Sequence, residues 1–419
     1  MISPFARFVT ASGLTNMADG IATVAWAWLA SLITRDPILI AIVPVMLRLP
    51  WFLFAIPAGI ITDRVDRRTL IIRMDILRAA AFVGAALAIW LALPLNTAPA
   101  QGTSNNLLYI GILGAALLVG IAEVFRDNAA QTMLPAIVPH AQLEKANGQL
   151  WSIEIIGNSL LGPAVGAFLI AIALPLPFAA NALAYFAAIL LLLRIKGSFR
   201  PTNDAPKNWR GELAEGYNFL KNAPLLRTLA LLTGGWNFVF HMMFVALVLH
   251  VQENLHLGAQ AYGLILAAGA IGGVLGGWLA EPIKNALGSA RTTQLALASS
   301  APVFLAVAYA PGPVSLAITI AVFEFSGLVW NTVSVSYRQR TIPDNLMGRV
   351  NSLYRLLAWG SMPLGLLLSG VVVRVSEIYL PRELALKAPF IAAAIGAALL
   401  TLAGWRALSK GFKDADNDT

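Results

Sequence analysis

Apolar residues run through this chain in long stretches that short polar links interrupt, from the first residues to the last. A bilayer crossing takes about 20 apolar residues in a helix. Because the hydrocarbon core offers no water, each crossing segment must satisfy its backbone polar groups within that helix. The pattern predicts twelve membrane helices, at residues 5–33, 37–60, 70–93, 107–126, 148–172, 177–194, 225–250, 260–281, 291–310, 313–337, 347–373 and 388–408.

The longest polar segment divides these helices into two groups of six. Residues 201–206 have the proline-rich composition of an extended linker. Leu213, Tyr217 and Leu220 then recur at helical spacing, which predicts an amphipathic helix on the membrane surface; a solvated linker is the alternative. The predicted parts are an N-terminal six-helix bundle (1–195), a cytoplasmic linker (196–224), a C-terminal six-helix bundle (225–408) and a cytoplasmic tail (409–419).

The two groups also share sequence features at a constant offset. Pro139 and Asn147 lie eight residues apart, as do Pro343 and Asn351, and each pair precedes the fifth helix of its group. The offset between the pairs is 204 residues, and Gly166 has a second glycine at the same offset. This internal repeat supports the division into two related halves.

Composition excludes most classes of soluble protein. Hydrophobic residues make up 58% and charged residues 12% of the 419 residues, against about half and a quarter in soluble proteins. The chain has no cysteine, which excludes disulfides and cysteine-ligated metals. The sequence also lacks a phosphate-binding loop, a His-Glu-x-x-His motif and a serine elbow. We therefore predict neither an enzyme nor a bound cofactor or metal.

Basic residues are distributed unequally between the two sides of the predicted membrane protein. If both termini are cytoplasmic, 24 of the 29 lysines and arginines lie in or beside inner loops and four lie in outer loops. Lys and Arg are enriched in cytoplasmic loops of membrane proteins. We therefore predict a multi-pass protein with both termini in the cytoplasm. The net charge of +8 does not indicate a nucleic-acid partner, because the basic residues lie between apolar runs.

One dense charge cluster follows the second predicted helix. Residues 59–78 read GIITDRVDRRTLIIRMDILR, with five arginines and three aspartates in twenty residues. So many charges do not fit hydrocarbon, so the segment predicts a tight loop between two membrane helices. The pattern Gly-x-x-x-Asp-Arg-x-x-Arg-Arg is met by Gly59, Asp63, Arg64, Arg67 and Arg68.

This loop resembles the signature between helices 2 and 3 of the major facilitator superfamily, although Asp66 stands where many members carry a second glycine. The run from Asp75 to Arg78, and residues 341–353, resemble the macrolide-efflux and enterobactin-exporter branch. The resemblance implies an all-α polytopic membrane protein with the major facilitator fold, 12 transmembrane helices in two six-helix bundles and a central substrate site. It also implies a drug:proton antiporter of the bacterial inner membrane, and we expect a monomer.

The charged loop has a mechanical role in that superfamily. Its aspartate contacts a helix N-terminus of the other half, where the helix dipole favours an anion, and its arginines bridge acidic neighbours. The alternative is that the arginines only fix the topology, which leaves Gly59 and Asp63 unexplained. The predicted inner gate consists of Gly59, Asp63, Arg64, Arg67, Arg68, Asp75, Arg78, Glu123 and Arg126.

Two charged residues lie near the middle of the first two predicted helices. An ionisable side chain at that depth costs at least about 2.5 kcal/mol, so it requires a partner or a function. Because the two helices are adjacent and antiparallel, we expect Asp19 and Arg48 to face each other as a proton-sensitive pair; a static ion pair is the alternative. Glu324, and Glu154 on the helical face of Asn158, are further predicted proton-coupling carboxyls.

Two other groups of residues have candidate roles. Gly162, Pro163 and Gly166 resemble the antiporter motif of drug exporters, and close helix packing is the alternative interpretation. His241 can titrate near neutral pH, or it is a hydrogen-bonded packing residue. The residues predicted to line a substrate cavity are Trp26, Asn158, Trp236, Asn237 and His241.

The sequence thus predicts a secondary active transporter that couples proton entry to efflux of an amphipathic small molecule, of drug, macrolide or siderophore type, by alternating access. Its partners are the small-molecule substrate, protons and the lipid bilayer. Two alternatives stay open. A lipid or lysolipid flippase uses the same fold, and a non-transporting membrane receptor or scaffold needs no proton-linked carboxyl.

Overall fold

A computed structural model of the chain describes residues 3–62, 64–139, 142–200, 209–343 and 346–417, which are almost entirely helical. The predicted all-α class is therefore confirmed. The chain divides into two compact units. Unit 1 comprises residues 1–203 and 256–267, and unit 2 comprises residues 204–255 and 268–419.

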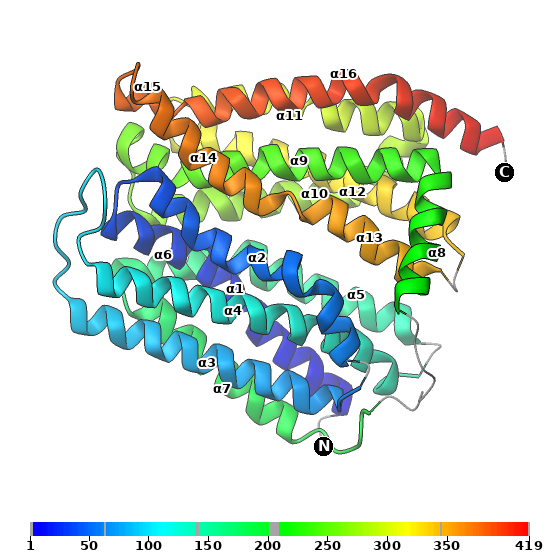
Figure 1. Cartoon of the computed structure of the whole chain (residues 1–419), viewed down its shortest axis with the longest axis horizontal. Helices are drawn as coiled ribbons and strands as arrows, with labels where there is room; N and C mark the ends of the chain where they lie inside the picture. The colour runs from blue at the N-terminus through cyan, green and yellow to red at the C-terminus, as the bar shows by residue number, and fades with distance from the viewer. Residues whose placement is uncertain (1–2, 63, 140–141, 201–208, 344–345, 418–419) are drawn as a thin grey trace. The chain divides into compact units, whose positions relative to one another are not determined.

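Unit 1 is a bundle in which α3 packs on α4 and α7, α1 packs on α6 and α7, and α2 packs on α4 (Figure 1). A single 3-10 turn, η1, follows α4, and the π-helix η3 separates α5 from α6. The elements are α1 (Pro4–Ile33), α2 (Pro37–Thr62), α3 (Arg67–Ala92), α4 (Asn106–Met133), η1 (Leu134–Ala136), α5 (Leu143–Glu154), η3 (Ile155–Leu161), α6 (Gly162–Ile172) and α7 (Leu176–Leu193).

In unit 2, α9 packs on α13, α14 and α16, and α11 packs on α12 and α16. The first turns of α10 belong to unit 1 and the rest of that helix to unit 2. The elements are α8 (Trp209–Asn222), α9 (Pro224–Leu249), η4 (His250–Asn254), α10 (Ala259–Ala298), α11 (Ser300–Ala308), α12 (Pro313–Thr341), α13 (Met347–Trp359), α14 (Met362–Ser376), α15 (Arg382–Ala385) and α16 (Ala388–Asn417).

Helix α8 covers the stretch that the sequence marks as amphipathic, but Tyr217 and Leu220 do not share one environment. Leu220 is buried in a core cluster with Leu225 and Leu226, whereas Tyr217 is 57% exposed. The close contact of α8 with α13 is made by Gly216, whose Cβ would lie 3.1 Å from the carbonyl oxygen of Arg349. The contact therefore leaves little room for a side chain at residue 216.

Asp66 caps helix α3, which gives a structural role to the position where the loop departs from the superfamily pattern. Its carboxylate accepts hydrogen bonds from the backbone N–H groups of Thr69 (2.9 Å) and Phe199 (2.7 Å). Partial burial acts to raise the pKa of Asp66, but these hydrogen bonds and the charge of Arg68 lower it below its usual range. The cap therefore stabilises the helix at neutral pH and is lost as the pH falls through that lowered pKa.

The internal repeat is visible in the helix boundaries. The offset of 204 residues takes Leu143, the first residue of α5, to Met347, the first residue of α13. It takes Ile172, the last residue of α6, to Ser376, the last residue of α14. Both runs are interrupted midway, the first by the π-helix and the second by a turn at residues 360–361. The two runs therefore share their ends and an interruption.

Among the described residues, ten helical stretches are long and apolar enough to cross a membrane. One of them, Ala259–Ala308, has 50 residues and contains a non-helical break at Gly288, so it is long enough for two crossings. Helix α1, which carries Asn16 and Asp19 in its middle, is not among the ten. Each predicted span overlaps a helix and the chain is a multi-pass membrane protein, but the count of twelve spans stays a prediction.

Candidate functional site

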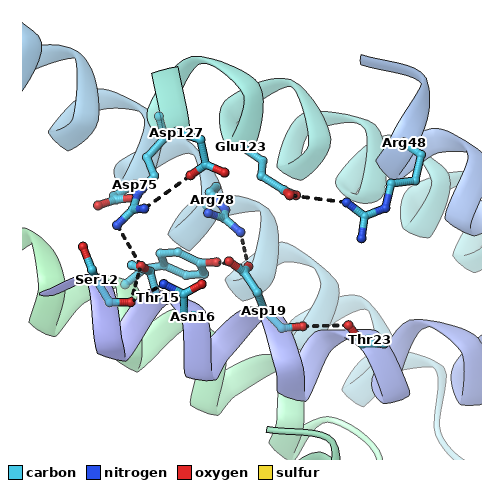
Figure 2. A network of polar contacts seen from close by, with 12 residues as sticks. Ser12, Thr15, Asn16, Asp19, Thr23, Arg48, Asp75, Arg78, Glu123 and Asp127 are labelled. Atoms are coloured by element: carbon cyan, nitrogen blue, oxygen red, sulfur yellow. Dashed lines mark hydrogen bonds and ion pairs between the residues drawn. The ribbon is translucent and has the colours of Figure 1, made fainter. Parts of the chain in front are cut away.

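Helix α1 presents a stripe of polar side chains at helical spacing inside unit 1 (Figure 2). Three of them form hydrogen bonds to backbone carbonyls of α1 itself. Thr15 and Asn16 donate to the carbonyl of Ser12 at 3.1 and 2.8 Å, and Thr23 donates to that of Asp19 at 3.0 Å. Such bonds back to the preceding turn let short polar side chains reside in an apolar helix. The Asp19 carboxylate, which cannot donate when ionised, requires partners from other helices.

Those partners come from α3 and α7. Asp19 Oδ1 forms an ion pair with Arg78 and accepts a hydrogen bond of 2.7 Å from the hydroxyl of Tyr185. The Arg78 guanidinium also lies over the Tyr185 ring, 4.5 Å from its centroid, and the Arg78 side chain is only 1% exposed. A carboxylate, a guanidinium and a phenol from three helices thus meet inside unit 1; we call them the Asp19 triad.

A second charged group lies beside the triad. Arg126 Nε is 3.6 Å from Asp75 Oδ1, and Arg126 Nη1 is 3.3 Å from Asp127 Oδ1. Arg126 Nη2 donates to the hydroxyl of Thr15 at 2.8 Å, which connects this group to the polar stripe of α1. Asp75 is fully buried. Helices α1, α3 and α4 are therefore joined through charged side chains.

The predicted pair of Asp19 and Arg48 is wrong. Figure 2 shows Arg48 directed toward Glu123 of α4, and their charged atoms are 3.6 Å apart. The reason lies in the helix packing, because α2 packs chiefly against α4 while α1 packs chiefly against α7. Neighbours in sequence are therefore not the closest neighbours in this bundle, and Arg78 rather than Arg48 is the ion-pair partner of Asp19.

Counting these charges shows an imbalance. We give the name polar cluster to seven of these side chains, which carry four carboxyl groups (Asp19, Asp75, Glu123 and Asp127) and three guanidinium groups (Arg48, Arg78 and Arg126). With every group ionised the cluster carries one excess negative charge. Asp75, Arg78 and Arg126 are buried, where ions are costly unless they are neutralised. One bound proton is the smallest change that balances the charge of the whole cluster.

Four residues of the predicted inner gate belong to this polar cluster. They are Asp75, Arg78, Glu123 and Arg126. Asp75 and Arg78 lie two or more turns from the loop end of α3, and the other two lie within α4. The structure thus places these charges near Asp19, and their role in an inner gate stays a prediction.

The loop itself is described in part. Asp63 lies outside the described residues. Arg67 donates to the carbonyl of Thr132 at 2.9 Å and Arg68 to that of Leu192 at 2.9 Å, in the last turns of α4 and α7. The last carbonyls of a helix lack partners within it, so these arginines tie the ends of two helices to the start of α3. Among the described residues, Arg64 and Gly59 show no such contact: Arg64 is exposed, and a Cβ on Gly59 would meet open space.

The glycines of the predicted antiporter motif lie where two backbones touch. A Cβ on Gly20 of α1 would lie 2.5 Å from the carbonyl oxygen of Asn158 and 2.9 Å from the Cα of Gly162. Only glycine permits this approach. Pro163 is the second residue of α6, two positions after the end of η3, and a proline without an N–H favours such a wider turn before it. The motif thus has a packing role, and its role in antiport stays a prediction.

We expect Gly20→Ala to lower the free energy of unfolding by about 1–3 kcal/mol, because the added methyl forces the two backbones apart. The matched control is Gly84→Ala in α3, where a Cβ would meet nothing within 4 Å. That variant should be neutral or stabilise the protein by up to about 1 kcal/mol, because alanine favours helix. Unfolding curves in detergent measure both. Equal effects of the two substitutions would contradict this account.

Trp26 packs inside unit 1, and its role in a substrate cavity stays a prediction. Its side chain is 2% exposed, and its ring lies 4.9 Å from Phe178 and 5.8 Å from Phe82. Glu154 is exposed and Asn158 is half-buried. The π-helix begins at residue 155, so the regular helical spacing that placed these two on one face does not apply.

The candidate cavity residues of unit 2 lie on α9. Trp236 Nε1 donates to the hydroxyl of Ser300 at 2.9 Å, and its ring stacks on Phe323 with 4.8 Å between centroids. Asn237 Nδ2 donates to the carbonyl of Ala358 at 2.9 Å, and His241 Nδ1 lies 2.8 Å from the carbonyl oxygen of Asn237. These contacts connect α9 to α11, α12 and α13.

Glu324 lies half-buried on α12 against the glycines of α10. Its Cγ is 3.3 Å from the point where a Cβ on Gly269 would lie, so the glycine makes room for the acidic side chain. Among the described residues Glu324 has no hydrogen-bond or ion-pair partner. It therefore differs from Asp19, whose charge is matched by an arginine.

Comparison with known proteins adds to this geometry. The sequence model of a family described as "Transmembrane secretion effector" matches residues 2–413. The multidrug efflux pump Tap of Mycobacterium tuberculosis is 27% identical over 383 residues, which cover 87% of this chain and 85% of Tap. The enterobactin exporter EntS of Citrobacter koseri is 26% identical over 310 residues, which cover 71% of this chain and 67% of EntS.

A solved structure of a bacterial homologue of the iron transporter ferroportin, in the inward-facing state, has a TM-score of 0.74 to this chain and covers 98% of both chains. It is 15% identical in sequence, so this likeness concerns the fold alone.

Proposed function

We propose that this chain, which belongs to the transmembrane secretion effector family of the major facilitator superfamily, exports an amphipathic small molecule in exchange for protons. The names of two relatives, a multidrug efflux pump and an enterobactin exporter, support efflux. The bacterial relatives support an inner-membrane location, and the distribution of lysine and arginine supports both termini in the cytoplasm. The two halves would alternate the access of a central site.

The polar cluster is the observation that carries the proton part of this proposal. Its excess negative charge means that one proton can bind a carboxylate and bring the cluster to neutrality. Asp19 is the carboxylate that we assign, because its partners come from two other helices and its side chain is 24% exposed. Protonation removes its attraction for Arg78 and so loosens the contact between α1 and α3.

Two further assignments are part of the proposal. Glu324 is a second proton-linked carboxyl, because it lies half-buried in a membrane helix without a basic partner among the described residues. Asp63 and Arg64 belong to a gate on the inner side, as the superfamily resemblance implies.

The test uses the purified full chain in proteoliposomes. A macrolide, a catechol siderophore and a lipophilic dye are the probes, and release of each is measured with and without an imposed pH gradient, together with an internal pH dye. We expect saturable release of at least one probe, faster with the gradient, and a matching pH change. Gradient-independent movement of a labelled lysolipid between leaflets would replace the proposal by a flippase. Absence of all movement by folded protein would favour a receptor or scaffold.

A further inference from the structure

Two polar side chains in the interior of unit 1 have no hydrogen-bond partner among the described residues. Asn181 on α7 is 0% exposed, and neither its amide nitrogen nor its amide oxygen is bonded. The indole nitrogen of Trp26, in a side chain that is 2% exposed, is unbonded as well. Buried amides almost always have partners, either protein groups or ordered water, so these atoms require an explanation.

The position of Asn181 follows from its neighbours on α7. Phe178, Asn181 and Tyr185 share one face of the helix, at spacings of three and four residues. Phe178 lies against Trp26, and Tyr185 bonds to Asp19. The amide of Asn181 therefore lies between the indole and the carboxylate. The unbonded atoms of Asn181 and Trp26 thus lie next to the Asp19 triad.

The triad and the group beside it have unbonded atoms too. Among the described residues, Arg78 Nε and Nη1 have no hydrogen-bond partner. The same holds for each of the two carboxylate oxygens of Asp75 and for the Nε of Arg126. Asp75 and Arg126 are close enough for attraction, at 3.6 Å, but too far apart for a direct hydrogen bond. A separation of that size between polar groups is commonly bridged by water.

We propose that a chain of bound water molecules runs through the interior of unit 1, from Asp75 and Arg126 past the Asp19 triad to Asn181 and Trp26, and that it conducts protons to and from Asp19. From Thr15, which Arg126 binds, to Trp26 the path covers eleven residues of α1, or about 16 Å at 1.5 Å per residue. Polar interiors hold water, whereas apolar cavities of similar size stay dry.

The proton step along this chain balances simply. Each water accepts a proton on one side and passes another on the opposite side, so only a proton is moved and the last one binds the Asp19 carboxylate. Asn181 donates and accepts, so it can hold a water in either orientation without titrating itself. The proton role rests on the proposed function; the bound water does not.

Radiolytic hydroxyl labelling in water enriched in oxygen-18 tests for the water itself, because side chains beside bound water are oxidised even when they are inaccessible from the surface. The full chain is labelled in detergent or nanodiscs, and each rate is divided by the rate in the denatured chain. Trp26 and Tyr185 are expected to react at least about tenfold faster, on this scale, than Phe8. Phe8 is an equally buried residue of unit 1, at 2% exposure, in an apolar cluster. Equal protection of all three would overturn the proposal.

Asn181→Leu separates the water chain from proton coupling. Leucine has the same number of side-chain heavy atoms as asparagine and binds no water, so labelling of Trp26 should fall to the level of Phe8 while that of Tyr185 persists. Gradient-driven release should slow several-fold with unchanged substrate affinity, and Asn181→Ser, which keeps a polar group, should retain both. Unchanged labelling and release in Asn181→Leu would overturn the path. If the wild type proves not to be proton-coupled, the labelling result still decides whether the water chain exists.

Discussion

Asp19→Asn is expected to reduce gradient-driven efflux to the level of protein-free vesicles while leaving exchange of substrate across the membrane at equal pH intact. Asparagine has the size of aspartate and keeps an oxygen that can accept from Tyr185, but it cannot bind and release a proton. The substitution also leaves three carboxyl groups opposite three guanidinium groups, so the polar cluster is neutral without a proton. Folding should therefore persist while coupling is lost.

The measurement is release of a transported probe with and without a pH gradient, at matched amounts of reconstituted protein. Asp414→Asn is the control, because Asp414 is an exposed carboxyl near the end of α16, outside the polar cluster. It should transport like the wild type. If Asp19→Asn still responds to the gradient as the wild type does, Asp19 is not the proton carrier, and Glu324 is the next residue to test.

Arg78→Gln is expected to destabilise the protein far more than Asp19→Asn, by about 3–5 kcal/mol, because it leaves buried carboxylates uncompensated. The guanidinium is 1% exposed, and it attracts Asp75 and Glu123 in addition to Asp19. Without it the polar cluster carries two excess negative charges. Unfolding in detergent, followed by tryptophan fluorescence, measures the loss.

The double variant Asp19→Asn/Arg78→Gln separates stability from function. It restores the wild-type excess of one negative charge, so most of the lost stability should return, and the coupling between the two substitutions should appear as non-additivity. Gradient-driven efflux should stay absent. Simple addition of the two effects would show that the ion pair contributes little, and recovery of efflux would show that neither residue carries the proton.

The helices of this protein could be predicted from sequence, because an apolar run of spanning length has few structures open to it in a bilayer. Each predicted span overlaps an observed helix. The predicted ends were less accurate: α4 continues to Met133 rather than residue 126, and α16 continues to Asn417 rather than residue 408. These extensions are polar segments that a count based on apolar length omits.

The site could be predicted only in part. Depth along α1 identified Asp19 as a buried carboxyl in need of a partner, and the structure gives it one. The partner could not be chosen correctly, since periodicity fixes depth but does not show which helices touch. Arg78 was within reach, because it lies eight residues inside the predicted third helix. Because the run that contains Arg78 resembles a loop motif, Arg78 was predicted to belong to the inner gate instead.

Tyr185 and Asn181 were missed for a different reason. Both lie within a run of apolar residues on α7, where a single tyrosine or asparagine is ordinary and carries no charge to attract notice. Their importance arises from facing α1, which only the fold determines. The signal that was available is their spacing of four residues, which places two polar groups on one face of an otherwise apolar helix.

The glycine that lets α1 touch α6 directly follows the aspartate that we assign to the proton. At Gly20 the two backbones are in direct contact without intervening side chains, so α1 cannot move toward η3 and α6 at that level without displacing them. We therefore expect a shift of α1 that accompanies the charge change at Asp19 to move η3 and α6 as well. The proposed proton-binding residue and the residue that makes this helix contact are thus consecutive in α1.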